Sequence, residues 1–171
     1  MEKFQKFMLL AAVVLFTTVS SCSSDDDGGG GGQAAQGTIT AKIDGVSFTS
    51  LEMTSFASVT TAGGQTTLVM QGNTSSQAIN IVINGYDGEG TYELSDNNVF
   101  RTASYIEPNV NNPVDTQTWT APYENSGLAG EINISEETET AVKGTFSFTG
   151  KNSNDDSIKT ITEGSFNLEK M

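Results

Sequence analysis

The chain contains no histidine and a single cysteine, and it has 8 basic residues against 21 acidic ones, for a formal net charge of −13. The lack of histidine excludes Ser-His-Asp and Cys-His nucleophilic systems and most zinc or copper sites. The shortage of basic residues argues against nucleic acid as a partner, because phosphate binding needs clustered lysine and arginine. With one cysteine no intramolecular disulfide can form, so core packing must hold the fold.

No apolar run is long enough to span a bilayer. The longest, Phe7–Phe16, follows Lys3 and Lys6 and has the length of a secretory signal core. It leads into Val19-Ser20-Ser21-Cys22, which resembles the bacterial lipobox. The resemblance implies that residues 1–21 are a signal peptide, that Cys22 becomes the lipidated first residue, and that its acyl chains (diacylglyceryl on the sulfur, a third on the amino terminus) anchor the protein to a membrane.

Residues 22–37 contain Asp25–Asp27 and Gly28–Gly32 and offer almost nothing to bury, so we expect a flexible tether. A serine followed by acidic residues just after the lipidated cysteine also resembles the surface-export signal of Bacteroidota lipoproteins. That resemblance implies the outer membrane, facing the cell exterior. The alternative is that the aspartates only keep a linker soluble.

Residues 38–171 are predicted to form one all-β domain, because apolar and polar residues alternate and helical runs are missing. The clearest core strand alternates Ile79, Ile81 and Ile83 with polar or smaller residues, and a further strand is predicted over Val99–Ile106. About ten short strands are expected in a single antiparallel domain. The pattern leaves open a sandwich or an up-and-down, lipocalin-like barrel, a choice that depends on whether the first and last strands pair.

Four segments of the domain resemble one family of uncharacterised Bacteroidota surface lipoproteins. They are Ala41–Phe48 (AKIDGVSF), Gly90–Leu94 (GTYEL), Gly144–Thr149 (GTFSFT) and Ile161–Asn167 (ITEGSFN). The resemblance implies a β-rich surface lipoprotein and brings no catalytic or binding residues with it. Gly144 and Gly164 are interpreted as positions of close backbone approach or bulging, and the phenylalanines beside them as core.

Carboxylates are the remaining candidates for chemistry. A glycosidase needs two carboxyls in a cleft with one of them desolvated, and Glu93 and Glu107 lie nearest to aromatic residues without being otherwise distinguished. Asp87 and Glu89 supply oxygen ligands suited to calcium in a turn, but the EF-hand spacing is missing and an ordinary hairpin turn explains them equally. The sequence therefore predicts no enzyme, no metal and no cofactor.

Aromatic residues give the best candidate for ligand binding. Trp119, Tyr123, Tyr105 and Tyr86 are predicted to form a platform for a sugar ring, with the loop over residues 109–115 lining a groove. The alternative is that Trp119 is a core or rim anchor. Asp156-Ser157-Ile158 also resembles the O-glycosylation sequon of Bacteroidota exported proteins.

The predicted function is a membrane-anchored, surface-exposed lipoprotein with a non-catalytic β domain. Its expected partners are the membrane, through the lipid, and a ligand, a glycan or an envelope protein. The alternatives are a structural or shielding envelope protein without a specific ligand, and a carboxylate-dependent glycosidase.

Overall fold

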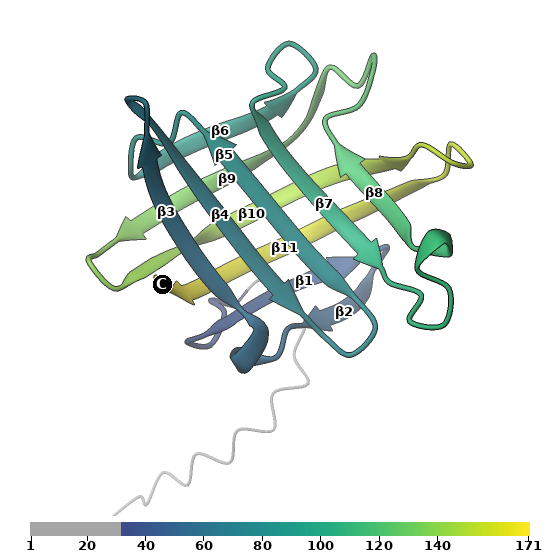
Figure 1. The fold of residues 1–171 in the computed structure, drawn as a ribbon, viewed down its shortest axis with the longest axis horizontal. Helices are drawn as coiled ribbons and strands as arrows, with labels where there is room; N and C mark the ends of the chain where they lie inside the picture. The colour runs from purple at the N-terminus through teal and green to yellow at the C-terminus, as the bar shows by residue number, and fades with distance from the viewer. Residues whose placement is uncertain (1–31) are drawn as a thin grey trace, which may run out of the picture.

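Alternation of apolar and polar residues shapes nearly all of the chain that the computed structural model describes, residues 32–171. These residues form a single antiparallel sheet of 11 strands curled into a half-barrel (Figure 1), which confirms the all-β prediction. Cys22, the predicted signal peptide and residues 22–31 of the predicted tether lie outside the described residues. No helix within residues 32–171 is long and apolar enough to cross a membrane.

The strands are β1 (Thr38–Ile43), β2 (Val46–Thr49), β3 (Phe56–Ala62), β4 (Gln65–Asn73), β5 (Ala78–Asn84), β6 (Gly90–Ser95), β7 (Arg101–Glu107), β8 (Gln117–Ala121), β9 (Leu128–Glu137), β10 (Ala141–Asn152) and β11 (Ile158–Glu169). Two 3-10 turns, η1 (Glu52–Thr54) and η2 (Pro113–Asp115), lie between strands. β10 and β11 have 12 residues each and are longer than the short strands expected.

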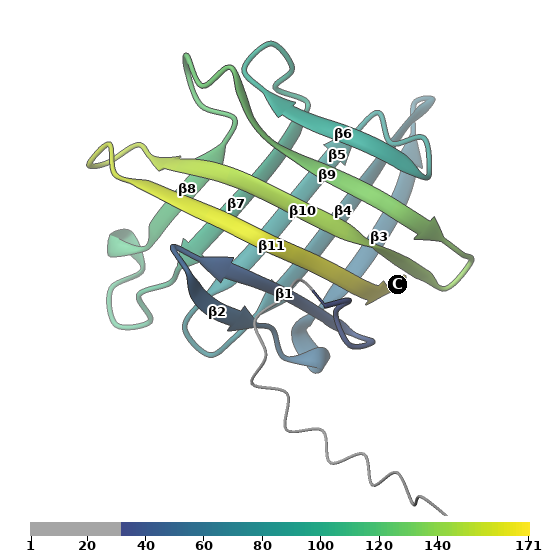
Figure 2. The same ribbon diagram turned by 180° about the vertical axis from the view of Figure 1, so that it is seen from behind.

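The strands lie in two crossing layers. β3, β4, β5, β7 and β8 form the front layer of Figure 1, and β6, β9, β10, β11 and β1 lie behind them, as Figure 2 shows from the other side. β10 joins the layers because its first part pairs with β9 whereas Lys151 and Asn152 pair with β8. The apolar faces of both layers point at each other and form the core.

Pairing of the first and last strands decides the architecture only in part. β1 pairs with β11 in antiparallel register, as a barrel requires. The path of strands nevertheless ends at β2 and β3, so the sheet does not close in the part of the chain that the structure describes. The C-terminus reaches the β3 edge, where the backbone N–H of Met171 donates to the carbonyl of Ala57 at 2.9 Å.

The predicted inward residues are buried. Ile79, Ile81 and Ile83 are fully inaccessible, and Tyr92 and Leu94 on β6 face the same core. Burying such side chains contributes about 1.5–3 kcal/mol each, relative to leaving them exposed. Isoleucines at every second position therefore fix which face of β5 points inward.

A β-bulge lets β11 keep its apolar residues inside. Phe146 lies opposite Gly164 and Phe148 opposite Ile161, so β11 has one residue more than β10 between these pairs. Glu163 lies in this bulge and adopts a positive φ of 51°. Without the bulge, strict alternation would place Ile161 and Gly164 on opposite faces of the sheet.

The described end of the predicted tether contacts the outer side of β11. Ala34 is buried and its N–H donates to Ser165 Oγ at 2.9 Å, while the N–H of Gly37 donates to the carbonyl of Asn167 at 2.7 Å. The chain thus enters the domain along the last strand.

Candidate functional site

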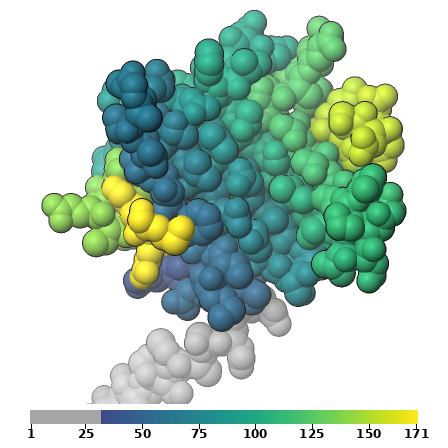
Figure 3. Space-filling model, in the orientation of Figure 1, coloured from purple at the N-terminus to yellow at the C-terminus, as the bar shows by residue number. Residues whose placement is uncertain are grey.

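Trp119 and Tyr105 lie side by side in the core at one end of the half-barrel. Their ring centroids are 5.7 Å apart, and Trp119 is only 6% exposed. The indole N–H donates to Ser157 Oγ at 2.9 Å, so the hydroxyl of the predicted glycosylation sequon accepts a hydrogen bond from the core. The turn that carries Ser157 and the β7–β8 loop lie side by side at the right edge of Figure 3. Nearby in the sequence, Asn152 Nδ2 at the end of β10 donates to Gln117 Oε1 at the start of β8 at 2.7 Å.

The ammonium group of Lys159 lies next to the aromatic rings at this end of the core. Its Nζ lies 4.6 Å from the Trp119 ring centroid and 3.3 Å from Glu107 Oε1. The Tyr105 hydroxyl donates to the same Glu107 oxygen at 2.8 Å. Burial, reinforced by the bond to Glu107, raises the pKa of Tyr105 above its ordinary value. Each group has its partner within the protein, so this cluster acts as a polar cap on the core.

Tyr86 lies at the opposite end of β5 from this cap, because Tyr105 pairs with Ile79 whereas Tyr86 follows Asn84, the last residue of β5. It is 6% exposed, and its hydroxyl donates to Glu137 Oε2 at 2.8 Å. Burial and this hydrogen bond raise the pKa of Tyr86. The structure therefore does not bring Tyr86 to Trp119.

Glu137 also accepts a 2.8 Å bond from Lys170 Nζ. Burial would raise the pKa of Glu137, but the hydrogen bonds from Lys170 and Tyr86 and the Lys170 charge outweigh it and lower the pKa. This ion pair ties the C-terminus to β9.

The remaining predicted site residues lie in loops. Tyr123 is half-buried in the β8–β9 connection. Asp87 and Glu89 are exposed in the β5–β6 turn, where Glu89 Oε1 accepts a 3.2 Å bond from the N–H of Glu137. Among residues 32–171, no three acidic side chains gather closely enough to hold a metal ion.

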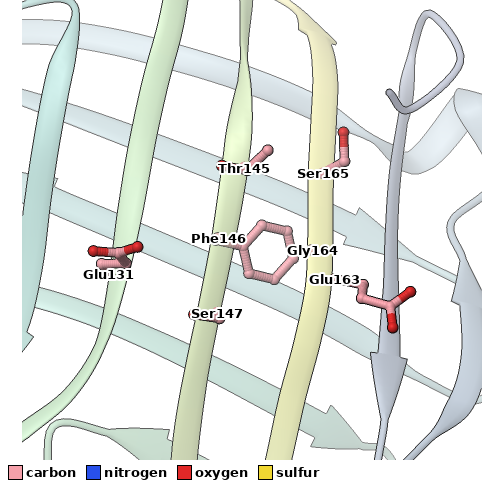
Figure 4. Close-up of a pocket in the computed structure, with 7 residues that line it drawn as sticks. All are labelled: Glu131, Thr145, Phe146, Ser147, Glu163, Gly164 and Ser165. Carbon is pink, nitrogen blue, oxygen red and sulfur yellow. The ribbon is translucent and has the colours of Figure 1, made fainter. Parts of the chain in front are cut away.

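A shallow hollow on the outer face of β9, β10 and β11 is shown in Figure 4. Its lining includes Glu131 and Glu163, which lie on either side of Phe146 and Gly164. The hollow measures about 170 Å³, both carboxylates are exposed, and Glu163 pairs with Lys42 at 2.9 Å. Exposed carboxylates lack the desolvation that keeps a general acid protonated.

A larger cavity, of about 560 Å³, lies at the end of the half-barrel away from Trp119. This volume falls in the range of about 300–1,000 Å³ that is typical of small-molecule sites. The starts of β4 and β7, the end of β5 and the β6–β7 turn form it, at the top of Figure 1. The lining residues are Gln65, Asn84, Gly85, Asn98, Phe100 and Arg101. We call it the Arg101 pocket.

Hydrogen bonds fix Phe100 at the rim of the Arg101 pocket. Its carbonyl accepts bonds from the backbone N–H and from Nδ2 of Asn84, both at 3.0 Å. Its N–H donates to Asn98 Oδ1 at 3.2 Å. Phe100 as a residue is nevertheless 67% exposed, so a backbone fixed by hydrogen bonds presents an open aromatic side chain.

Arg101, the sole arginine of the sequence, differs from the lysines in its surroundings. Each of the five lysines in residues 32–171 has a carboxylate oxygen within 4.0 Å, but Arg101 has none among these residues. Its guanidinium lies over the ring of Tyr92, 5.1 Å from the centroid. Its Nε is buried and has no hydrogen-bond partner in the described chain.

Sequence reasoning missed this pocket for two reasons. The strand predicted over 99–106 begins only at Arg101, because the Asn98–Phe100 hydrogen bond keeps Val99 and Phe100 in the turn. The available signal was a lone arginine next to an aromatic residue in a strongly acidic chain. Nothing in the sequence showed that the start of β4 and the end of β5 would lie beside it.

The fold and the Arg101 pocket together define a small all-β domain with a ligand-sized cavity at one end of a half-barrel. The chain belongs to the family described as a domain of unknown function, DUF6252, which matches residues 35–168. Comparison with curated proteins and with solved structures gives no match.

Proposed function

We propose that this protein is a lipid-anchored outer-membrane protein of Bacteroidota that faces the cell exterior and binds a small ligand or glycan without catalysis. The Arg101 pocket carries the binding part of the proposal. Its lining combines two features common in ligand sites, a fixed aromatic surface and a few polar groups, and contains no carboxylate. The network of bonds around Phe100 supports a pocket that exists before its ligand arrives.

The anchoring part of the proposal depends on Cys22 and on the residues around it. The lipobox-like sequence supports lipidation, and the following Ser24 and Asp25–Asp27 support export to the surface. We expect Cys22→Ser to move the protein from the membrane fraction to the soluble fraction. A variant that still sediments with membranes would remove this part of the proposal.

The non-catalytic part is supported by the chemistry available at the pocket. A glycosidase uses a pair of carboxyls about 5–10 Å apart, and no carboxylate lines the Arg101 pocket. The lack of histidine in the sequence removes the usual general base. Bound glycan should therefore be recovered intact after incubation with the protein.

Amide NMR spectra of the chain from residue 22 onwards, carrying Cys22→Ser, test the binding function. We expect one or more members of a panel of neutral and acidic oligosaccharides to shift the resonances of Asn98, Phe100 and Arg101. Phe100→Ala should weaken this binding, whereas Val110→Ala, at another exposed apolar loop residue, should not. Shifts confined to other surfaces, or none with any member, would instead favour a shielding protein without a specific ligand.

A further inference from the structure

Within residues 32–171, one cationic side chain has no carboxylate within ion-pair distance. Lys42, Lys143, Lys151, Lys159 and Lys170 each pair with a carboxylate of the same chain. Arg101 has no such partner within residues 32–171, although the protein has 21 acidic residues from which one could have come. Arg101 is also one of the residues that line the Arg101 pocket.

The position of Arg101 is fixed before any ligand binds. Cation–π contact with Tyr92 holds the guanidinium at 5.1 Å from the ring centroid. Tyr92 is itself buried, and its hydroxyl makes two hydrogen bonds. It accepts one from the N–H of Asp87 at 3.0 Å and donates one to the carbonyl of Gly88 at 2.7 Å. A guanidinium held in this way loses little freedom when it binds an anion.

We propose, on the basis of the binding function above, that the Arg101 pocket takes a sugar that carries a carboxylate, such as a uronic acid unit of a glycan. The guanidinium presents a planar fork of N–H donors that matches the two oxygens of a carboxylate. The single cation of the lining matches a singly charged group better than a doubly charged phosphate. The carboxylate would supply the partner that the chain does not give to Arg101.

The rest of the lining favours a sugar over a peptide terminus. Gln65 and Asn98 carry amides, which donate and accept hydrogen bonds as sugar hydroxyls do. Phe100 offers an exposed ring face at the rim, and the lining contains no other large apolar side chain to receive those of a peptide. A Cβ built at Gly85 would lie 3.3 Å from Gln65 Nε2, so the Gln65 amide packs against the backbone of Gly85 at the pocket edge.

Isothermal titration of the Cys22→Ser chain with matched oligosaccharides tests this inference. The probes are a trigalacturonate, its methyl ester and neutral galactose trisaccharide, together with an N-acetylated tripeptide that has a free C-terminus. We expect the trigalacturonate to bind at least about tenfold more tightly than the ester or the neutral sugar, and the difference to shrink at high salt. Because the ester changes only the ligand, this comparison does not depend on the folding of any variant.

Two substitutions connect the binding to Arg101. Arg101→Gln should weaken trigalacturonate binding at least about tenfold and leave any neutral-sugar binding nearly unchanged. Arg101→Lys, which keeps the charge but loses the fork, should give an intermediate affinity. Lys151→Gln is the matched control, because it removes a cation from β10, away from the Arg101 pocket, and should have no effect.

The outcomes separate this inference from the proposed function. Equal binding of the acid and its methyl ester, with shifts at Phe100, would overturn the carboxylate inference and leave the binding function standing. Binding of the tripeptide alone would overturn the sugar class in the same way. If no probe binds and the wider oligosaccharide panel also leaves Asn98, Phe100 and Arg101 unshifted, both proposals fall.

Discussion

Phe146 on β10 lies directly opposite Gly164 on β11, and its ring occupies the space that a side chain at position 164 would need. A Cβ built at Gly164 would meet the ring atom Cδ2 of Phe146 at 2.7 Å and would press on the Phe146 carbonyl oxygen. The same relationship recurs two residues away, where Phe166 lies opposite Gly144. The two glycines allow two phenylalanines to lie across neighbouring strands in the core.

Gly164→Ala should therefore destabilise the domain. Overpacking of a filled core costs about 1–3 kcal/mol, and here part of the obstacle is backbone that cannot rotate away. The free energy of unfolding in urea measures the effect. Thr145→Ala, at an exposed position of β10, is the control and should stay within about 0.5 kcal/mol of the parent. Equal stability of the two variants would contradict the close packing at Gly164.

Glu137 should make the unfolding free energy of the domain depend on pH in the acid range. Its pKa is lowered in the folded state, so its contribution is fully present above the ordinary value of 4.5 and is lost as the pH falls through the folded pKa. Glu137→Gln should cost about 1–3 kcal/mol at neutral pH, because it leaves Lys170 and Tyr86 without their acceptor charge. Urea unfolding at several pH values should show this cost shrinking towards low pH.

Glu136→Gln is the matched control for Glu137. Glu136 pairs with Lys143 at 2.8 Å, but its side chain is 48% exposed. Exposed ion pairs contribute about 0–1 kcal/mol, so the substitution should have a small effect. A cost that does not vary with pH for Glu137→Gln would argue against a lowered pKa.

Tyr86 and Tyr105 should resist ionisation in alkali. Both pKa values are raised above the ordinary 10.0, so the neutral hydroxyls contribute stability that is present below 10.0 and is lost as the pH rises towards the folded pKa. Tyrosinate absorbance should therefore include a late phase that coincides with unfolding followed by circular dichroism. Tyr86→Phe and Tyr105→Phe should each reduce this phase, and a phase complete before unfolding would contradict the raised values.

Trp119 should report directly on Lys159, because it is the only tryptophan in the chain. Lys159→Met removes a cation 4.6 Å from the indole ring and the partner of Glu107. We expect a change in tryptophan emission and a loss of about 0.5–2 kcal/mol in unfolding free energy. Lys151→Met, which removes an exposed pair with Asp156, should change neither. Unaltered emission in Lys159→Met would contradict the contact.

The alternation of side chains determined much of the fold by itself. Ile79, Ile81 and Ile83 predicted one face of β5 correctly, since burying three isoleucines outweighs any other arrangement of that strand. Turn residues such as Asp44-Gly45 placed the β1–β2 hairpin, and both residues have positive φ. These are local properties, which a sequence shows directly.

Only the tertiary structure decided which residues meet. Tyr86, Tyr105 and Trp119 were predicted to share one aromatic platform. The order of the strands instead places Tyr105 against Trp119 and leaves Tyr86 beyond the other end of β5. The order of non-consecutive strands also brings Gln65, Asn84 and Arg101 to one cavity. The sequence by itself determined the strands and their inward faces. The pairing of distant strands decided where the Arg101 pocket forms, because it alone brings these residues together.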